Sequence, residues 1–159
     1  MAHLLMLTAV LVAQVAPQDL DARRKQLSSL LDEQWEYTMR TSPEYASILG
    51  DKRYNDQLTD FSEKAVLADI EAQRQFLARF KAVDPAGLPE QEALSRALMV
   101  RQLEMGLSGV RFKDWEMPVS QFSGIHINAP QLVSVLSFET VKDYDDYIAR
   151  LRKLPVAFA

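Results

Sequence analysis

Apolar residues recur at steps of three and four over most of the chain that follows residue 18. That spacing is the period of an amphipathic α-helix. It predicts an all-α fold, a multi-helix array built as one domain. The expected helices cover residues 20–40, 44–49, 63–83, 90–107 and 131–136, and a last helix begins at residue 141.

Residues that favour helix ends stand at the boundaries of these segments. Asp19, Ser62 and Thr140 are expected N-caps, because a short polar side chain there accepts a hydrogen bond from a free backbone N–H. Pro43 opens the short second helix, and Gly50 is placed to end it. These signals support the boundaries independently of the apolar pattern.

In two of the expected helices, the distribution of apolar residues also predicts how the helix packs. In residues 90–107 the apolar positions spread over more than one face, which predicts neighbours on two sides. Residues 115–118 and 124–130 are expected to form ordered loops. The last helix has one apolar stripe, which consists of Val141, Tyr144, Ile148, Leu151 and Leu154.

The charges of the last helix are ordered along its axis. Asp143, Asp145 and Asp146 lie in its first turns, and Arg150, Arg152 and Lys153 lie in its last. Negative charge near the amino end and positive charge near the carboxyl end complement the helix dipole. The pattern therefore supports a helix in this position.

Residues 1–18 have a different character. Residues 4–16 are apolar apart from Thr8 and Gln14. This run is shorter than the roughly 20 residues that span a bilayer, and it suits the apolar core of a signal peptide. We expect a signal peptide over residues 1–18, a helical domain over residues 19–159, a secreted or periplasmic location, and no integral membrane span.

Composition narrows the function further. The chain has 159 residues, 48% hydrophobic and 25% charged, with a net charge of −4, which is typical of a globular protein. Nucleic acid is not an expected partner, because binding phosphates requires a basic face. The chain contains no cysteine, which excludes disulfides and zinc–thiolate sites.

Histidine offers little chemistry in this chain. The only two are His3, inside the expected signal peptide, and His126, which has no carboxylate in the four residues after it. A helical zinc pair needs two imidazoles one turn apart and a nearby glutamate. We interpret His126 as a structural or loop residue, with a place in the lining of a cleft as the alternative.

The remaining polar groups have structural interpretations. Asp51, Asp56 and Asp60 lack the spacing of a calcium loop and are expected to form caps, turns and an ion pair with Arg53. The one-turn pair of Asp32 and Glu36 is expected on a solvated face. Ser108 and Ser123 lack the strand and glycines that present a nucleophile. We therefore assign no catalytic, cofactor-binding or metal residue.

Three groups of segments, in this order and spacing, resemble a known family. They are SPEYASILGD at residues 42–51, followed by RYND at 53–56 and LTDFS at 58–62; WEMPVSQFSG at residues 115–124; and DYDDYIARL at residues 143–151, followed by Pro155. Together they resemble the amino-terminal part of the bacterial family called domain of unknown function 885 (DUF885). Each segment is short, so the specificity lies in their order.

This resemblance implies a large, nearly all-helical protein, often exported and related to zincin-type metallopeptidases. Members are several times longer than this chain, and their His-Glu-x-x-His signature lies in a later part. It implies zinc in a full-length relative and none held by this chain, and peptide as the substrate class. The partner that it implies is the carboxy-terminal part of the same protein.

Two functions remain open at this point. The chain is either the incomplete front portion of a zincin-like hydrolase, or a self-standing helical binding module of the periplasm or cell surface without catalysis. Well-capped helices favour the module. The apolar end, residues 155–159, favours the front portion.

Overall fold

The computed structural model describes residues 19–157 of the chain. Within them it contains α-helices and short 3-10 helices and no strand, which confirms the all-α prediction. The expected signal peptide lies outside the described residues. The α-helices are α1 (Leu20–Thr41), α2 (Pro43–Ile48), α3 (Glu63–Ala82), α4 (Glu90–Gly109), α5 (Ile125–Leu132), α6 (Val141–Leu151) and α7 (Leu154–Ala157).

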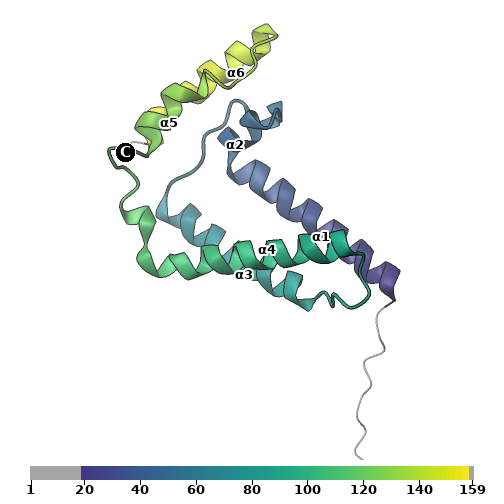
Figure 1. Cartoon of the computed structure of the whole chain (residues 1–159). Coiled ribbons are helices and arrows are strands. Elements are labelled where there is room, and N and C mark those ends of the chain that lie inside the picture. Colours follow the sequence, from purple (N-terminus) through teal and green to yellow (C-terminus); the bar gives the residue numbers. More distant parts are fainter. Residues whose placement is uncertain (1–18, 158–159) are drawn as a thin grey trace, which may run out of the picture.

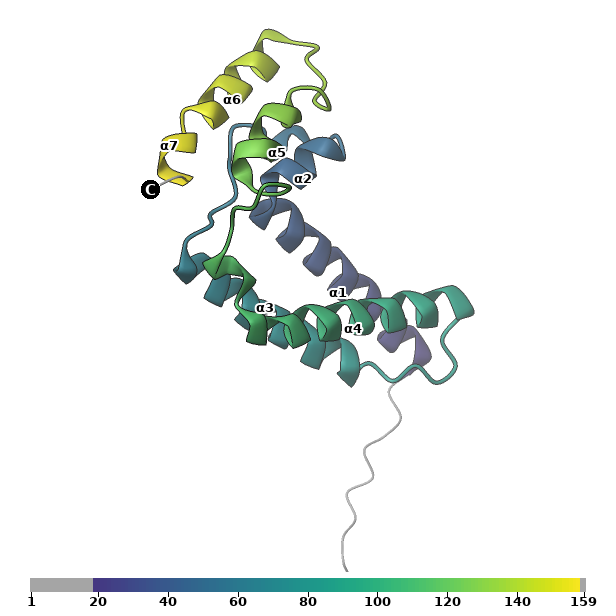
Figure 2. The same ribbon diagram turned by 60° about the vertical axis from the view of Figure 1, so that its left-hand side comes forward.

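The helices form two groups joined by the long helix α1. Helices α1, α3 and α4 pack together as a three-helix base, with α3 and α4 side by side (Figure 1). Helices α2, α5, α6 and α7 gather at the carboxyl end of α1 (Figure 2). We call this second group the upper layer. None of the helices between residues 19 and 157 combines the length and apolar content needed to cross a bilayer.

The hydrophobic core lies in the three-helix base. Its buried members are Leu27 and Leu30 from α1, Phe76 and Phe80 from α3, Val83 just after α3, and Leu103 from α4. Burying such side chains is the main favourable term in folding. The core therefore holds the helices of the base together. The upper layer does not contribute to this cluster and is held by other contacts.

Helix caps follow the sequence at two of three expected places. The Ser62 hydroxyl accepts from the N–H of Ala65 at 3.3 Å. Thr140 and Asp143 form a reciprocal capping box at the start of α6. The predicted cap at Asp19 is wrong in its chemistry, because its side chain makes no capping hydrogen bond, although its backbone carbonyl accepts from Arg23 at 3.1 Å.

The region around α5 corrects the predicted boundaries. The sequence suggested a loop over residues 124–130 and a helix over residues 131–136, but α5 spans Ile125–Leu132 and turns follow it. Gly124 has a φ of 131°, which a glycine adopts readily, and this redirects the chain into the helix. Pro130 lies inside α5, so this proline does not mark a loop.

One packing prediction is confirmed and one is wrong. Helix α4 packs on two neighbours, α3 and α1, as predicted, while Leu94, Leu98 and Met105 remain exposed on a face without cover among residues 19–157. On α6 the apolar stripe is not a core face. The exposed members are Val141, Tyr144, Ile148 and Leu151, whereas the buried residues of this helix are Asp143 and Arg150.

Candidate functional site: an apolar pocket beside a buried arginine

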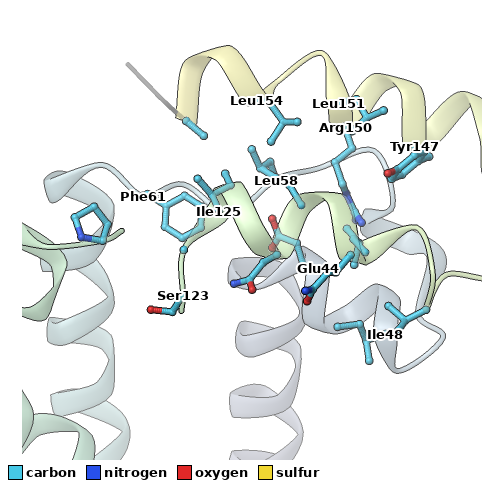
Figure 3. Close-up of a pocket in the computed structure, with 18 of the residues that line it drawn as sticks. Glu44, Ile48, Leu58, Phe61, Ser123, Ile125, Tyr147, Arg150, Leu151 and Leu154 are labelled. Carbon is cyan, nitrogen blue, oxygen red and sulfur yellow. The ribbon is translucent and has the colours of Figure 1, made fainter. Parts of the chain in front are cut away.

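The upper layer and the loops beside it line an open pocket of about 920 Å³. Its walls come from α2, the loop after it, the segment before α5, and helices α5, α6 and α7 (Figure 3). Apolar side chains supply most of the lining, among them Ile48, Leu58, Phe61, Ile125, Leu132 and Leu154. A concave, mostly apolar site with a few polar groups is the usual form of a ligand site.

Arg150 is the most deeply buried charged group in this pocket wall. Its side chain leaves α6 and points toward α2 (Figure 3), and the residue is 1% exposed. Nε donates to the Gln57 carbonyl at 2.6 Å, and Nη2 donates to the Tyr54 carbonyl at 2.8 Å and to the Ser47 hydroxyl at 2.7 Å. These bonds tie α6 to α2 and to the loop that follows α2.

Ser47 has a second role in this cluster. While its hydroxyl oxygen accepts from Arg150, its O–H lies 2.6 Å from the Asn55 side-chain oxygen and 2.9 Å from the Pro43 carbonyl. Ser47 and Asn55 are both buried. The Arg150 guanidinium therefore lies against a buried polar cluster formed by Ser47 and Asn55, which we call the cradle.

The start of α6 carries a second buried charged residue, Asp143. Asp143 accepts from the backbone N–H groups of Thr140 at 2.8 Å and Glu139 at 3.0 Å, and Lys52 lies 3.1 Å from its carboxylate. Asp143 and Arg150 are seven residues, or about two turns, apart and share one helix face. That face is turned inward, and the cap and the cradle fix it at its two ends.

The charge of Arg150 is incompletely compensated. Among residues 19–157 no carboxylate forms an ion pair with it, and its Nη1 is buried without a hydrogen-bond partner. Burial lowers the pKa of Arg150, and the nearby carboxylates of Glu44 and Asp56 partly oppose that effect. A guanidinium stays protonated in proteins, so a positive charge borders the pocket.

Glu44 is the carboxylate that lines the same pocket. Its oxygens accept from Thr59, one from the backbone N–H at 3.0 Å and the other from the hydroxyl. Glu44 thereby ties α2 to the loop before α3. Because it already has these partners, it acts on Arg150 through its charge and not through a hydrogen bond.

The described residues do not fit a zinc ion. His126 is exposed on α5, cysteine is absent from the chain, and residues 19–157 hold no group of three His, Cys, Asp or Glu that could ligate a metal. A catalytic zinc takes three protein ligands. No catalytic step through zinc is assigned to these residues.

The other polar residues singled out from the sequence lie outside the pocket or have structural partners. Asp51 caps the 3-10 helix Lys52–Tyr54 and pairs with Arg53 at 2.6 Å, as predicted. Arg53 also pairs with Glu36 at 2.8 Å on the solvated face where Asp32 is exposed too. Asp60 accepts from the Ser62 N–H at 2.9 Å.

Of the two serines considered, only Ser123 lines the pocket. Its hydroxyl lies 2.9 Å from that of Ser120, and no histidine takes part in this contact. The Ser108 hydroxyl donates to the Met105 carbonyl at 2.7 Å. Neither hydroxyl is paired with a general base, as nucleophilic catalysis requires.

A protein-family model matches residues 43–159, which is most of the chain and includes every residue that lines the pocket. Its description is bacterial protein of unknown function (DUF885). The chain belongs to this family. No curated protein and no solved structure matches the chain.

In this DUF885 chain, sequence reasoning missed the residue that shapes the site. Arg150 was assigned to the helix dipole, because a basic residue in a last helical turn has that simple explanation. No local signal in the sequence could have found it. Asp143 and Arg150 share a helix face opposite to the exposed stripe of Val141, Tyr144 and Ile148, and a charged face opposite an apolar one ordinarily predicts that the apolar face is buried.

Proposed function

We propose that this chain is the amino-terminal, ligand-binding portion of an exported, zincin-like DUF885 protein and that it carries out no catalysis by itself. The observation that carries the proposal is the pocket of about 920 Å³ beside Arg150. Its size and its apolar lining suit a peptide-sized or smaller organic ligand.

The way in which the pocket walls are assembled supports a role in binding. The walls come from residues 44–61, 118–135 and 147–157, three segments that are distant along the chain. Hydrogen bonds from one residue, Arg150, connect the third segment to the first. A site held by such cross-contacts is preorganised, which favours ligand binding because less order has to be created on association.

The zincin-like relationship is the part of the proposal that concerns catalysis. The resemblance implies that a later part of full-length relatives supplies the zinc ligands, and the residues described here supply none. In this arrangement the upper layer forms one wall of a substrate cleft, and the peptide is cleaved by groups outside residues 19–157.

A test of this division uses two proteins, the present chain and a chain extended along the same reading frame. We expect tight zinc binding and peptidase activity only in the extended chain. Metal analysis after dialysis and hydrolysis of a fluorogenic peptide library measure both. Peptidase activity in the present chain that His126→Ala abolishes would contradict the proposal.

The binding role has its own test. Leu154→Glu places a charge in the apolar lining, whereas Leu98→Glu places the same charge on the exposed face of α4. We expect binding of an apolar fluorescent dye to fall strongly in Leu154→Glu and to persist in Leu98→Glu. Equal dye binding by the two variants would show that the dye does not bind in this pocket and would contradict the proposed binding role.

Export is a separate element of the proposal and rests on the apolar run at residues 4–16. We expect cleavage between residues 13 and 19 in an expressing bacterium. Mass spectrometry of the periplasmic or secreted protein locates the new amino terminus. An intact Met1 in the cytoplasmic fraction would contradict export.

The second candidate function is a self-standing binding module without catalysis. It is favoured by the three-helix base, which has its own buried core. The two candidates differ in one observable result. If the extended chain also lacks zinc and peptidase activity while the apolar pocket still binds a ligand, the module is the better description.

A further inference from the structure

The buried guanidinium at the pocket wall narrows the chemistry of the ligand. Arg150 is 1% exposed and has hydrogen-bond partners for Nε and Nη2, whereas Nη1 is buried without one among the described residues. An unpaired buried donor is costly, and the cost is larger for a charged group. The guanidinium therefore borders the pocket with a charge that its own hydrogen-bond partners satisfy only in part.

The charge of the group points in the same direction. The partners of Arg150 are the hydroxyl of Ser47 and backbone carbonyls, which are all neutral. Carboxylates act on it only from a distance. A buried cation without a direct counterion gains more from an anion than from a neutral acceptor, because hydrogen bonds between charged groups are the stronger ones.

The rest of the pocket limits what can carry that anion. Its lining is mainly apolar, with Leu58, Ile125 and Leu154 among its walls. A strongly hydrated ion such as free phosphate would lose water there without compensation. An apolar group that bears one carboxylate satisfies both the lining and the guanidinium.

We propose that the upper-layer pocket of this protein binds an apolar monocarboxylate whose carboxylate lies on the side of the pocket that Arg150 borders, where the charge of the buried guanidinium attracts it. The inference rests on the proposed binding role of the pocket and adds the ligand class. Two sources share this chemistry, the free carboxyl terminus of an apolar peptide and a medium-chain fatty acid.

The experiment compares carboxylates with their neutral amides at pH 7. The probes are N-acetyl-leucyl-phenylalanine and decanoate, each beside its own primary amide, titrated into the whole chain by calorimetry. We expect each carboxylate that binds to do so about tenfold more tightly than its amide, since only the carboxylate is attracted by the buried charge of Arg150. The tighter of the two carboxylates identifies the source.

Glu44 provides a test that leaves Arg150 in place. Glu44→Gln removes a negative charge beside the guanidinium and retains an acceptor for Thr59. We expect it to tighten carboxylate binding about threefold relative to amide binding, because a nearby like charge repels only the charged ligand. The matched control is Glu36→Gln on the solvated face, which should leave both affinities unchanged.

The possible results separate this inference from the proposed function. If carboxylate and amide bind equally, the pocket binds apolar ligands as proposed, and recognition of the carboxylate by Arg150 is wrong. If none of the four probes binds, the binding role of the pocket fails together with the inference. If carboxylates are preferred but Glu44→Gln and Glu36→Gln have the same effect, the anion lies elsewhere and the inference is wrong.

Discussion

Arg150 donates a hydrogen bond of 2.7 Å to Ser47, a residue 103 positions earlier in the chain. The bond joins α6 to α2, two helices of the upper layer. The apolar residues of α6 are mostly exposed, so the helix is held by its buried charged face instead. Polar contacts therefore hold α6 in the upper layer, whereas buried apolar side chains such as Leu27 and Phe80 hold the helices of the base together.

Replacing Arg150 should destabilise the protein considerably. Arg150→Met removes the donors to Ser47 and to the Tyr54 and Gln57 carbonyls and leaves these acceptors unpaired. Unpaired buried acceptors cost on the order of 1–3 kcal/mol each, and partial relaxation reduces the sum, so we expect a loss of about 3 kcal/mol. Urea denaturation followed by circular dichroism measures it.

The matched control removes a surface arginine with an ion pair of its own. Arg79 pairs with Glu33 at 2.6 Å, and both side chains are about half exposed. Exposed pairs contribute little, so Arg79→Met should cost less than about 1 kcal/mol. Similar losses for Arg79→Met and Arg150→Met would show that the Arg150 cluster does not hold the upper layer.

Asp143 should give the stability of the protein a recognisable dependence on pH. Hydrogen bonds from the Thr140 backbone, together with Lys52, hold the pKa of Asp143 well below its usual value. A carboxyl whose pKa is depressed by folding stabilises the protein above its unfolded pKa, about 3.9, and this contribution is lost as the pH falls toward the folded-state pKa.

The variant Asp143→Ala tests this sign. At pH 7 it should lose about 1–2 kcal/mol, because the capping box and the contact with Lys52 disappear together. The difference between wild type and variant should shrink as the pH is lowered below about 4. Denaturation midpoints between pH 2 and 7 measure it, and a difference that grows toward acid would contradict the assignment.

How much of this structure follows from the sequence depends on the kind of signal. Helix existence was predictable because it rests on local periodicity and caps, as at Ser62 and at Thr140 with Asp143. Which face of α6 is buried was not predictable. That choice depends on Ser47 and on carbonyls about 100 residues away, and no local pattern encodes them.

The pocket illustrates the same limit. No short motif marks it, since its lining combines ordinary apolar residues from three separate segments. The polar groups that attracted notice, such as Asp51 and Glu36, proved to pair with Arg53 at the surface. Local clustering of charge in the sequence therefore pointed away from the site, because surface ion pairs produce the same pattern.

The three-helix base should tolerate substitutions much less well than the segment before α5. Phe80 is fully buried in the core, whereas Phe122 is 83% exposed. Phe80→Ala should cost about 3–5 kcal/mol, since it combines lost burial with a cavity, and Phe122→Ala should change stability by less than about 0.5 kcal/mol. Thermal denaturation of both variants measures the contrast, and equal losses would contradict the assignment of the core.

The uncovered face of α4 should make the chain self-associate. Leu94, Leu98 and Met105 are 49%, 56% and 63% exposed, and they lie together on one side of the helix. Contiguous exposed apolar surface favours association in water. We expect sedimentation velocity to show a concentration-dependent increase in mass, and we expect the double variant Leu98→Glu with Met105→Glu to remain monomeric at the same concentrations.

Val141→Glu is the control, because Val141 is 78% exposed but lies at the start of α6 in the upper layer, where a glutamate also favours the helix. It should associate as the wild type does. A monomeric wild type would show that this face needs no cover, and equal association of the double variant would place the contact on another surface.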